Sequence, residues 1–181
     1  HYTVTSPCGP SRASLLTGLY AMNHRSIRNG TPLPQQHPTM ASELRKAGYE
    51  PMLFGYTDVS ADPQNRHPND PDLKTYEGLA PGFSEIVRMR LDSNSSWIGY
   101  LKAKGYQLPQ NYWDLFKPVA ADGGQGPAIS DPALYSAADS DTAFLTDRTL
   151  EELSAREDQD WFSLLTYIRP HPPLVAPVPY N

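Results

Sequence analysis

The sequence predicts an α/β protein with a mainly parallel sheet and helices on both faces. Two stretches support this prediction, residues 39–56 and 139–168, because each reads as a helix followed by an apolar strand. Strands that are apolar throughout are typical of parallel sheets covered on both faces. With 39% hydrophobic residues in 181, the chain is also long enough to form a hydrophobic core.

The first helix is predicted to begin near Pro10, which suits a first helical turn. Residues 11–22 support it with three leucines at helical spacing, Leu15, Leu16 and Leu19. Asn29-Gly30 and the prolines that follow it predict turns.

The two helix–strand units come next. In the first, Thr39 is an N-cap candidate, Gly48 ends the helix and YEPMLFGY (49–56) is the strand. In the second, residues 139–156 form an amphipathic helix before the strand WFSLLTYI (161–168). The expected buried face of that helix consists of Leu145, Thr149, Leu150 and Leu153.

The remaining stretches, residues 58–92 and 106–137, are rich in Pro, Asp, Asn and Gly, and we expect loops there. A helix candidate from Ser93 to Lys104 separates them. The chain starts at His1 rather than at a methionine, so we expect a fragment of a longer protein.

Composition excludes several classes of protein. A formal net charge of -5 argues against a nucleic-acid partner, because phosphate backbones are held by clustered Lys and Arg. No apolar run approaches the roughly 20 residues that cross a bilayer, and no signal-peptide pattern is present. We therefore expect a soluble protein without membrane contact, with the cytoplasm as the favoured compartment. A single cysteine excludes an internal disulfide framework and a cysteine-rich zinc module.

Polar residues that directly follow the predicted strands are the first site candidates, because ligands of open α/β sheets bind beyond the carboxyl ends of the strands. They are Tyr56, Thr57 and Asp58 after one strand, and Arg169 and His171 after the other. Each also has a plain structural interpretation. Tyr56 and Thr57 can form strand-end hydrogen bonds, and His171, between prolines, can be a solvated or capping residue.

The stretch SPCGPSRASLLTG (6–18) holds the only cysteine, Cys8, at the start of a predicted helix. Unpaired N–H groups and the helix dipole favour negative charge there, and Arg12 lies one turn on, so the pair suits an anion such as phosphate or sulfate. A structural cysteine beside a surface arginine is the alternative. A reactive thiolate is another, although no neighbouring His or Asn pattern supports it.

The segment CGPSR, continued by ASLLTG, resembles the CxPSR signature of the sulfatase family in the alkaline phosphatase superfamily. AGYEPMLFGY resembles the second signature of that family, and HPPLVAPVPY resembles its PHxP region. Residues 59–137 are least covered. The resemblance implies an alkaline-phosphatase-like α/β sandwich, of which this chain is a partial domain.

The same resemblance implies a mechanism. In the family the signature cysteine is converted to formylglycine, whose hydrated form ligates one divalent metal and attacks phosphorus or sulfur. Cys8 is accordingly the expected nucleophile and metal ligand, with Arg12 holding it. The implied partners are the formylglycine-generating machinery and a small anionic ester substrate.

One departure from the family pattern indicates the subfamily. Sulfatases generally carry Lys and His in a GKxH-like pattern where this chain has GYTD (55–58), so a cationic sulfate contact is missing. Together with MNHRSIRNGTPL, this is most similar to phosphonate monoester hydrolases and phosphodiesterases. Asn29, Tyr56 and Thr57 would then bind substrate, although Asn29-Gly30 can be merely a turn. His171 resembles the histidine near the leaving group, where it could act as a general acid.

Two functional alternatives stay open: an arylsulfatase, and a noncatalytic sulfatase-like binding domain. The metal-ligand motifs that the family has upstream and downstream of these segments are missing from residues 1–181, so we expect an N-terminal to middle portion of a catalytic domain that is inactive alone. Whether Ca, Mn, Mg or Zn binds, and whether the protein is a homo-oligomer, stays open. Four acidic residues match neither motif and are not assigned as ligands: Asp58, Asp62, Asp139 and Asp141.

Overall fold

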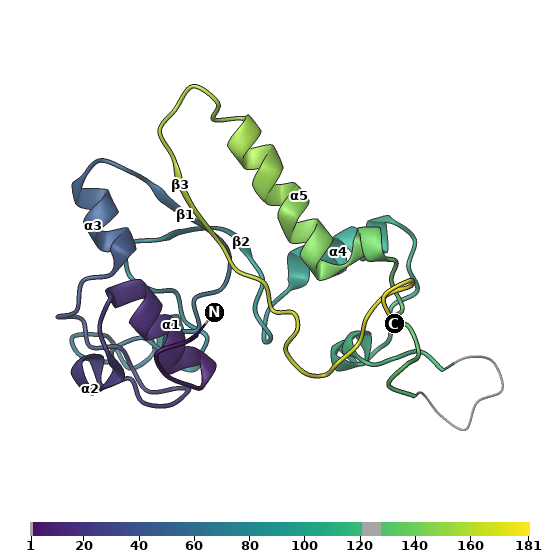
Figure 1. Ribbon diagram of the computed structural model, residues 1–181, viewed down its shortest axis with the longest axis horizontal. Coiled ribbons are helices and arrows are strands. Elements are labelled where there is room, and N and C mark those ends of the chain that lie inside the picture. Colours follow the sequence, from purple (N-terminus) through teal and green to yellow (C-terminus); the bar gives the residue numbers. More distant parts are fainter. Residues whose placement is uncertain (1, 121–127) are drawn as a thin grey trace.

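The computed structural model describes residues 2–120 and 128–181, which form a mainly parallel sheet with helices packed on it (Figure 1). The strand order is β2-β1-β3, with β1 at Pro51–Gly55, β2 at Ser84–Arg88 and β3 at Phe162–Leu165. Both outer strands pair with β1 in parallel. The two predicted strands are therefore confirmed.

β2 corrects the expectation that residues 58–92 contain only loops. Its sequence SEIVR is short and carries two charges, and Ile86 is 36% exposed, so no apolar run marks it. The strand forms because its backbone pairs with the buried strand β1, and edge strands commonly carry charged side chains.

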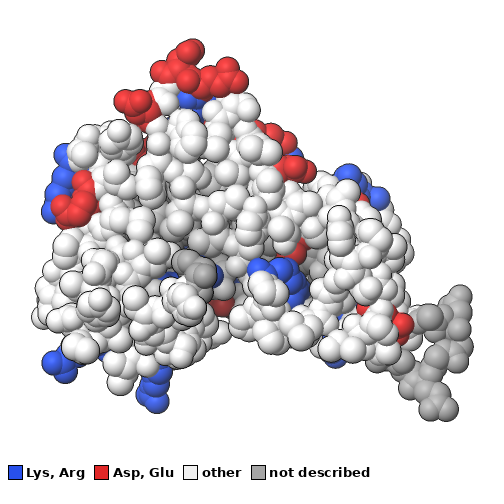
Figure 2. Space-filling view, viewed as in Figure 1, with Lys and Arg blue, Asp and Glu red and all other residues white. Residues whose placement is uncertain are grey.

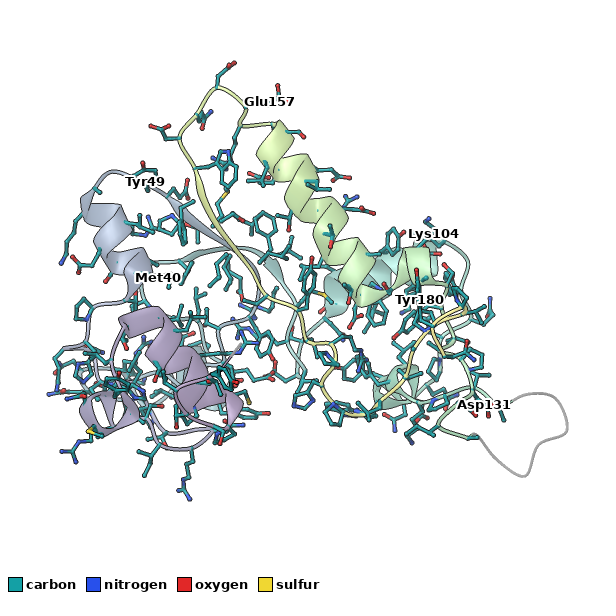
Figure 3. All side chains as sticks on the ribbon, in the orientation of Figure 1. Met40, Tyr49, Lys104, Asp131, Glu157 and Tyr180 are labelled. Atoms are coloured by element: carbon teal, nitrogen blue, oxygen red, sulfur yellow. The ribbon has the colours of Figure 1, made fainter. Side chains whose placement is uncertain are left out.

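The side chains of β1 alternate between two cores, as neighbouring residues of a strand must. Met52 and Phe54 pack with α4 (Ser95–Ala103), α5 (Asp141–Ser154) and the 3₁₀ helix Tyr112–Phe116. Leu53 packs with α1 (Cys8–Thr17) and α3 (Met40–Lys46) on the opposite face. Side chains fill the space between helices and sheet on both faces (Figure 3). The prediction of helices on both faces is thus confirmed.

α1 begins at Cys8, two residues before the predicted start, and ends at Gly18 in the left-handed conformation. Pro10 is accommodated because N–H groups in a first helical turn have no acceptor within the helix. The helix buries Leu16, whereas Leu15 is 60% exposed and does not belong to its packed face. A separate short helix, α2, spans Ala21–His24.

The two other predicted helices have the expected caps. Thr39 forms a capping box with Ser42, and Ser140 accepts a hydrogen bond from Ala143 N at the start of α5. On α5 the expected Leu150 is 57% exposed, and Phe144 takes a buried place instead. The predicted helix from Ser93 to Lys104 is confirmed as α4.

The loop predicted at 58–92 contains a further 3₁₀ helix at Pro71–Lys74, and another, Ala137–Asp139, lies between the loop predicted at 106–137 and α5. Residues 121–127 of the loop predicted at 106–137 lie outside the described residues. Among the helices of the described chain, none has the length and apolar character needed to cross a bilayer. On the face shown in Figure 2, Lys and Arg are scattered, and acidic side chains gather around the turn between α5 and β3.

Candidate active site

Cys8 is the first residue of α1, so its side chain lies beside the unpaired N–H groups of the helix N-terminus. Pro7 precedes it and provides no side-chain cap. The Asn29 side chain supplies the partners instead: Gly9 N donates to its Oδ1 at 2.9 Å, and its Nδ2 donates to Cys8 Sγ at 3.0 Å. One amide therefore fixes both the helix start and the thiol.

Asn29 also lies in the predicted turn, in which Thr31 N donates to Arg28 O and Gly30 adopts a φ of 79°. Asn29 therefore forms part of a turn and also binds the Cys8 sulfur. The turn lies close to the start of α1, because a Cβ on Gly9 would lie 3.0 Å from Asn29 Oδ1. A larger residue than glycine at position 9 would displace the amide that holds Cys8.

Arg12 joins α1 to the end of β1. Its Nη1 donates to the Tyr56 carbonyl at 3.2 Å, and its guanidinium lies 4.1 Å from the centroid of the Tyr56 ring. Tyr56 is 4% exposed, and burial raises the pKa of its hydroxyl while the Arg12 charge acts in the opposite direction. The Arg12 guanidinium remains charged while it stacks on Tyr56, so it also contributes positive charge to the site.

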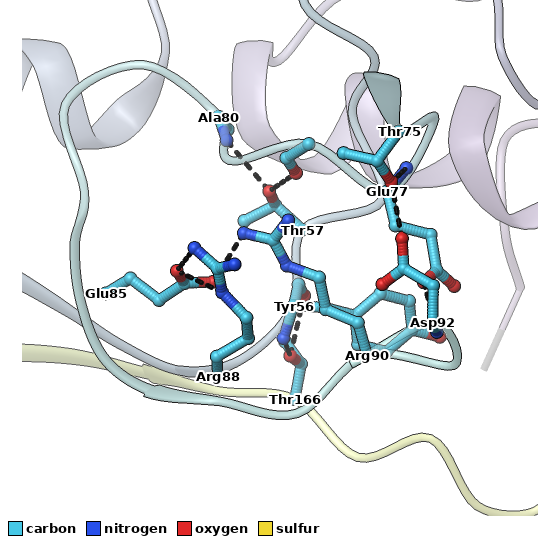
Figure 4. Close-up of polar contacts among 11 residues, drawn as sticks. Tyr56, Thr57, Thr75, Glu77, Ala80, Glu85, Arg88, Arg90, Asp92 and Thr166 are labelled. Carbon is cyan, nitrogen blue, oxygen red and sulfur yellow. Dashed lines mark hydrogen bonds and ion pairs between the residues drawn. The ribbon is translucent and has the colours of Figure 1, made fainter. Parts of the chain in front are cut away.

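The backbone around Tyr56 is fixed by β3. Tyr56 N donates to Thr166 Oγ1, which donates to the Tyr56 carbonyl at 2.7 Å (Figure 4). Gly55 has a φ of 111°, and a Cβ there would lie 2.0 Å from Thr166 O, so this crossing requires glycine. The carboxyl ends of β1 and β3 are therefore held together at one edge of the sheet, where the sequence placed the site.

Thr57 is 1% exposed and anchors the loop that leads into β2. Its Oγ1 donates to Gly78 O at 2.9 Å and accepts from Ala80 N at 2.8 Å (Figure 4). The Thr57 hydroxyl hydrogen is therefore already engaged in a hydrogen bond with the Gly78 carbonyl. The predicted substrate contact of Thr57 stays a prediction.

His171 follows β3 and lies near the same edge. Its backbone N donates to Ile168 O, and its Nδ1 lies 2.6 Å from the Pro172 carbonyl oxygen. The Arg169 guanidinium donates to the His171 carbonyl at 3.0 Å. The charge of His171 opposes the rise that burial causes in the pKa of Asp58, so the two residues lie in the same region of the site.

Asp58 is the site residue that sequence reasoning set aside. It is 4% exposed, and its pKa is raised by burial, against the opposing effects of Cys8, Arg12 and His171. Those three residues come from α1 and from the segment after β3, so Asp58 lies where the two meet. The rule that ligands bind beyond the carboxyl ends of strands indicated it, but it matches no ligand motif of the family.

The environment of Cys8 disfavours a thiolate. Burial raises the pKa of the thiol, the nearby Asp58 carboxylate raises it further, and the contacts with Asn29 and Gly9 act in the opposite direction. Reactive cysteines have a lowered pKa, because the thiolate is the nucleophile. The surroundings therefore argue against the alternative of a simple thiolate enzyme.

A hard divalent cation needs several oxygen ligands, usually including carboxylates. Within residues 2–120 and 128–181, no group of three or more His, Cys, Asp or Glu side chains could hold a metal ion. Of the residues at this edge, Asp58 supplies a carboxylate, and position 8 would supply oxygen only after modification. The described residues alone do not fit a complete metal centre.

The fold and the arrangement around Cys8 define a member of the sulfatase family: the family model "Sulfatase" matches residues 1–181. The chain belongs to this family. It is 38% identical over its whole length to the multifunctional alkaline phosphatase superfamily protein PehA of Trinickia caryophylli, and 25% identical over 97% of its length to a choline-sulfatase of Rhizobium meliloti.

Solved structures agree with this assignment. The phosphonate monoester hydrolase SpPMH of Silicibacter pomeroyi is 57% identical over the whole chain, with a TM-score of 0.95. The phosphonate monoester hydrolase of Agrobacterium radiobacter is 41% identical over the whole chain, with a TM-score of 0.87. The alkaline-phosphatase-like fold is thus confirmed for a partial domain, since the chain spans 35% of either structure and of PehA.

Proposed function

We propose that the complete protein is a metal-dependent hydrolase of phosphonate monoesters and phosphate diesters that uses a formylglycine made from Cys8. The observation that carries the proposal is the arrangement of Cys8 at the start of α1, with the Asn29 amide on its sulfur and Arg12 stacked on Tyr56. Membership of the sulfatase family and 57% identity to a phosphonate monoester hydrolase support it. Sulfatases generally use a divalent metal and formylglycine.

Position 8 would supply the nucleophilic oxygen after oxidation of the thiol to an aldehyde and hydration. A helix N-terminus suits this step, because its N–H groups and dipole favour the negative charge of an approaching ester. A divalent metal at this position would lower the pKa of the attacking hydroxyl and offset charge on the ester oxygens. Its further ligands would come from outside the described residues.

The neighbouring side chains suit the remaining requirements of ester cleavage. Asn29 Nδ2, which now donates to Cys8 Sγ, is a donor of the kind that binds a non-bridging ester oxygen. Arg12 contributes positive charge and holds Tyr56 in place. His171 has a ring that can protonate or stabilise the departing oxygen. Thr57 would support these groups by anchoring the loop at Gly78.

Peptide mass tests the nucleophile. When the complete gene product is made together with a formylglycine-generating system, the peptide that contains Cys8 should carry the thiol-to-aldehyde change. Replacing Cys8 by alanine should abolish ester cleavage. Full activity with an unmodified cysteine, or undiminished activity of Cys8→Ala, would contradict the proposal.

A sulfatase is the second candidate, favoured by the family model and by the similarity to a choline-sulfatase. Matched aryl esters of sulfate, of a phosphonate and of a phosphate diester distinguish the two. We expect the phosphonate and the diester to have the higher kcat/KM, because the chain has Tyr56 and Thr57 in place of the cationic contact in the sulfatase pattern. A higher kcat/KM for the sulfate would make the protein a sulfatase.

A further inference from the structure

Asp58 has an unusual backbone conformation for a residue with a side chain. Its φ is 53°, in the left-handed region, and it follows β1 by three residues. This turn brings its backbone against α1, since a Cβ on Gly9 would lie 3.4 Å from the Asp58 carbonyl oxygen. Asp and Asn adopt this conformation more readily than other residues with a Cβ, and backbone conformations of this kind cluster at functional sites. Its effect here is to place an acidic residue beside Gly9, the residue that follows Cys8.

The Asp58 carboxylate is buried and only partly satisfied. The Asp58 carbonyl oxygen lies beside Gly9, the residue that follows Cys8, and the side-chain Oδ2 is a buried atom with no hydrogen-bond partner among the described residues. The Arg12 guanidinium, the cation on the same face, directs Nη1 to the Tyr56 carbonyl. Buried polar atoms are nearly always hydrogen-bonded, so an unsatisfied carboxylate oxygen at a reacting position calls for a functional explanation.

We propose that Asp58 determines charge selectivity, favouring esters with one negative charge at the reacting group over doubly charged phosphate monoesters. This inference rests on the proposed function, because phosphonate monoesters and phosphate diesters are singly charged whereas phosphate monoesters carry two charges above their second pKa. A buried carboxylate beside position 8 repels either substrate. The dianion experiences about twice the repulsion, at a site where low solvent exposure weakens screening.

The surroundings of the site make such a filter necessary. Arg12, the Asn29 amide and the N–H groups of α1 all attract negative charge, and without an opposing group they would bind the dianion more tightly than the monoanion. Specificity between similar ligands often requires a repulsive element of this kind. Asp58, whose carbonyl oxygen lies beside Gly9 and whose carboxylate is buried at this edge of the sheet, can supply it.

The test is Asp58→Asn in the complete gene product carrying formylglycine. Asparagine has nearly the same shape and tolerates the left-handed conformation, so the fold should be kept. We measure kcat/KM at about pH 8, well above the second phosphate pKa of about 6, for a matched aryl phosphate monoester and aryl phosphonate monoester. The ratio of the first to the second should rise at least about tenfold in the variant, as expected for removal of a like-charge contact.

Glu43→Gln is the matched control, because it removes one negative charge at an exposed residue of α3 and should leave the ratio unchanged. A ratio for Asp58→Asn equal to that of the control would overturn the proposal. If Asp58→Asn does not fold, Asp58→Gly replaces it, since glycine adopts a positive φ freely and also removes the carboxylate.

A binding measurement separates failure of this inference from failure of the proposed function. Calorimetry at the same pH compares phenylphosphonate, a dianion, with methylphenylphosphinate, a monoanion that has no ester bond to cleave. Asp58→Asn should increase the affinity for the dianion relative to the monoanion at least about tenfold, whichever ester the enzyme cleaves. Equal relative affinities in both proteins refute the role of Asp58. Absence of phosphonate and diester turnover in the unaltered protein refutes the proposed function alone.

Discussion

Glu77 is a buried acid whose ionisation should make stability depend on pH near neutrality. It is 1% exposed, and its Oε2 accepts a hydrogen bond from Asp92 N at 3.1 Å. Burial, together with the adjacent Asp92 carboxylate, raises its pKa from 4.5 to about 7. Thr75 bridges the pair, donating to Asp92 Oδ2 while accepting from Glu77 N (Figure 4). The folded protein therefore keeps a proton here that the unfolded chain releases.

The sign follows from proton binding. Between about pH 4.5 and 7 the folded state binds more protons at Glu77 than the unfolded state, so the free energy of unfolding falls as pH rises, by about 3 kcal/mol in total. The stabilisation of the folded state by protonated Glu77 is complete below about pH 4.5 and lost above about pH 7. Glu77→Gln keeps a neutral side chain that can accept from Asp92 N and donate to the Asp92 carboxylate. The variant should lose this pH dependence and be the more stable protein at about pH 8.

Urea unfolding followed by tryptophan fluorescence, in steps between about pH 5 and pH 8, measures the effect. Glu43→Gln, at an exposed position on α3, should follow the unaltered protein at every pH. Parallel stability curves for Glu77→Gln and the unaltered protein would refute the reasoning, because they would show that Glu77 is ionised in the folded state throughout this range.

Three further predictions follow from single contacts. Gly55→Ala should lower the free energy of unfolding by more than about 3 kcal/mol in urea titration, because its Cβ would overlap Thr166 O; a loss below about 1 kcal/mol would contradict this. Glu85→Ala should cost about 3 kcal/mol in the same assay, since it leaves the buried Arg90 guanidinium, now 2.6 Å from Glu85, without its partner; unchanged stability would exclude a buried ion pair (Figure 4). In the complete gene product, Arg12→Lys should reduce kcat/KM for phosphonate esters at least about tenfold, because lysine cannot stack on Tyr56 and donate to its carbonyl together; full activity would show that charge alone suffices.

The parts of the fold that could be predicted are those specified by local sequence. α3 and α5 were predictable because Thr39 and Ser140 are capping residues followed by helical spacing, and β1 because it lies in a compact apolar run of strand length. β2 was not, because its formation depends on backbone pairing with a strand about 30 residues earlier. Neither capping chemistry nor apolar periodicity reports on such a partner. Leu15 and Leu150 were expected on the packed faces of their helices but are exposed. Helical spacing shows which residues share a face, but it does not show which of them another element covers.

For the site, sequence reasoning named residues but could not show how they connect. Cys8, Asn29 and Tyr56 are brought together by contacts that no spacing rule contains: an amide bonded to a sulfur, and a guanidinium that joins α1 to β1. Asp58 was set aside because it matches no ligand motif of the family. Its left-handed turn and its buried oxygen, which give it significance, exist only in the folded chain.

The charges around Cys8 favour chemistry at an oxygen over chemistry at sulfur. A thiolate nucleophile would need its pKa lowered, yet burial and the Asp58 carboxylate raise it. The same features suit a hydroxyl-bearing side chain at position 8. Such a group is neutral, has a hydroxyl hydrogen to donate toward the buried Asp58 carboxylate, and can accept from Asn29 Nδ2 as the thiol sulfur does now. Under the proposed function, a site that disfavours ionisation of its cysteine would therefore still provide a nucleophile, once that cysteine had been oxidised and hydrated.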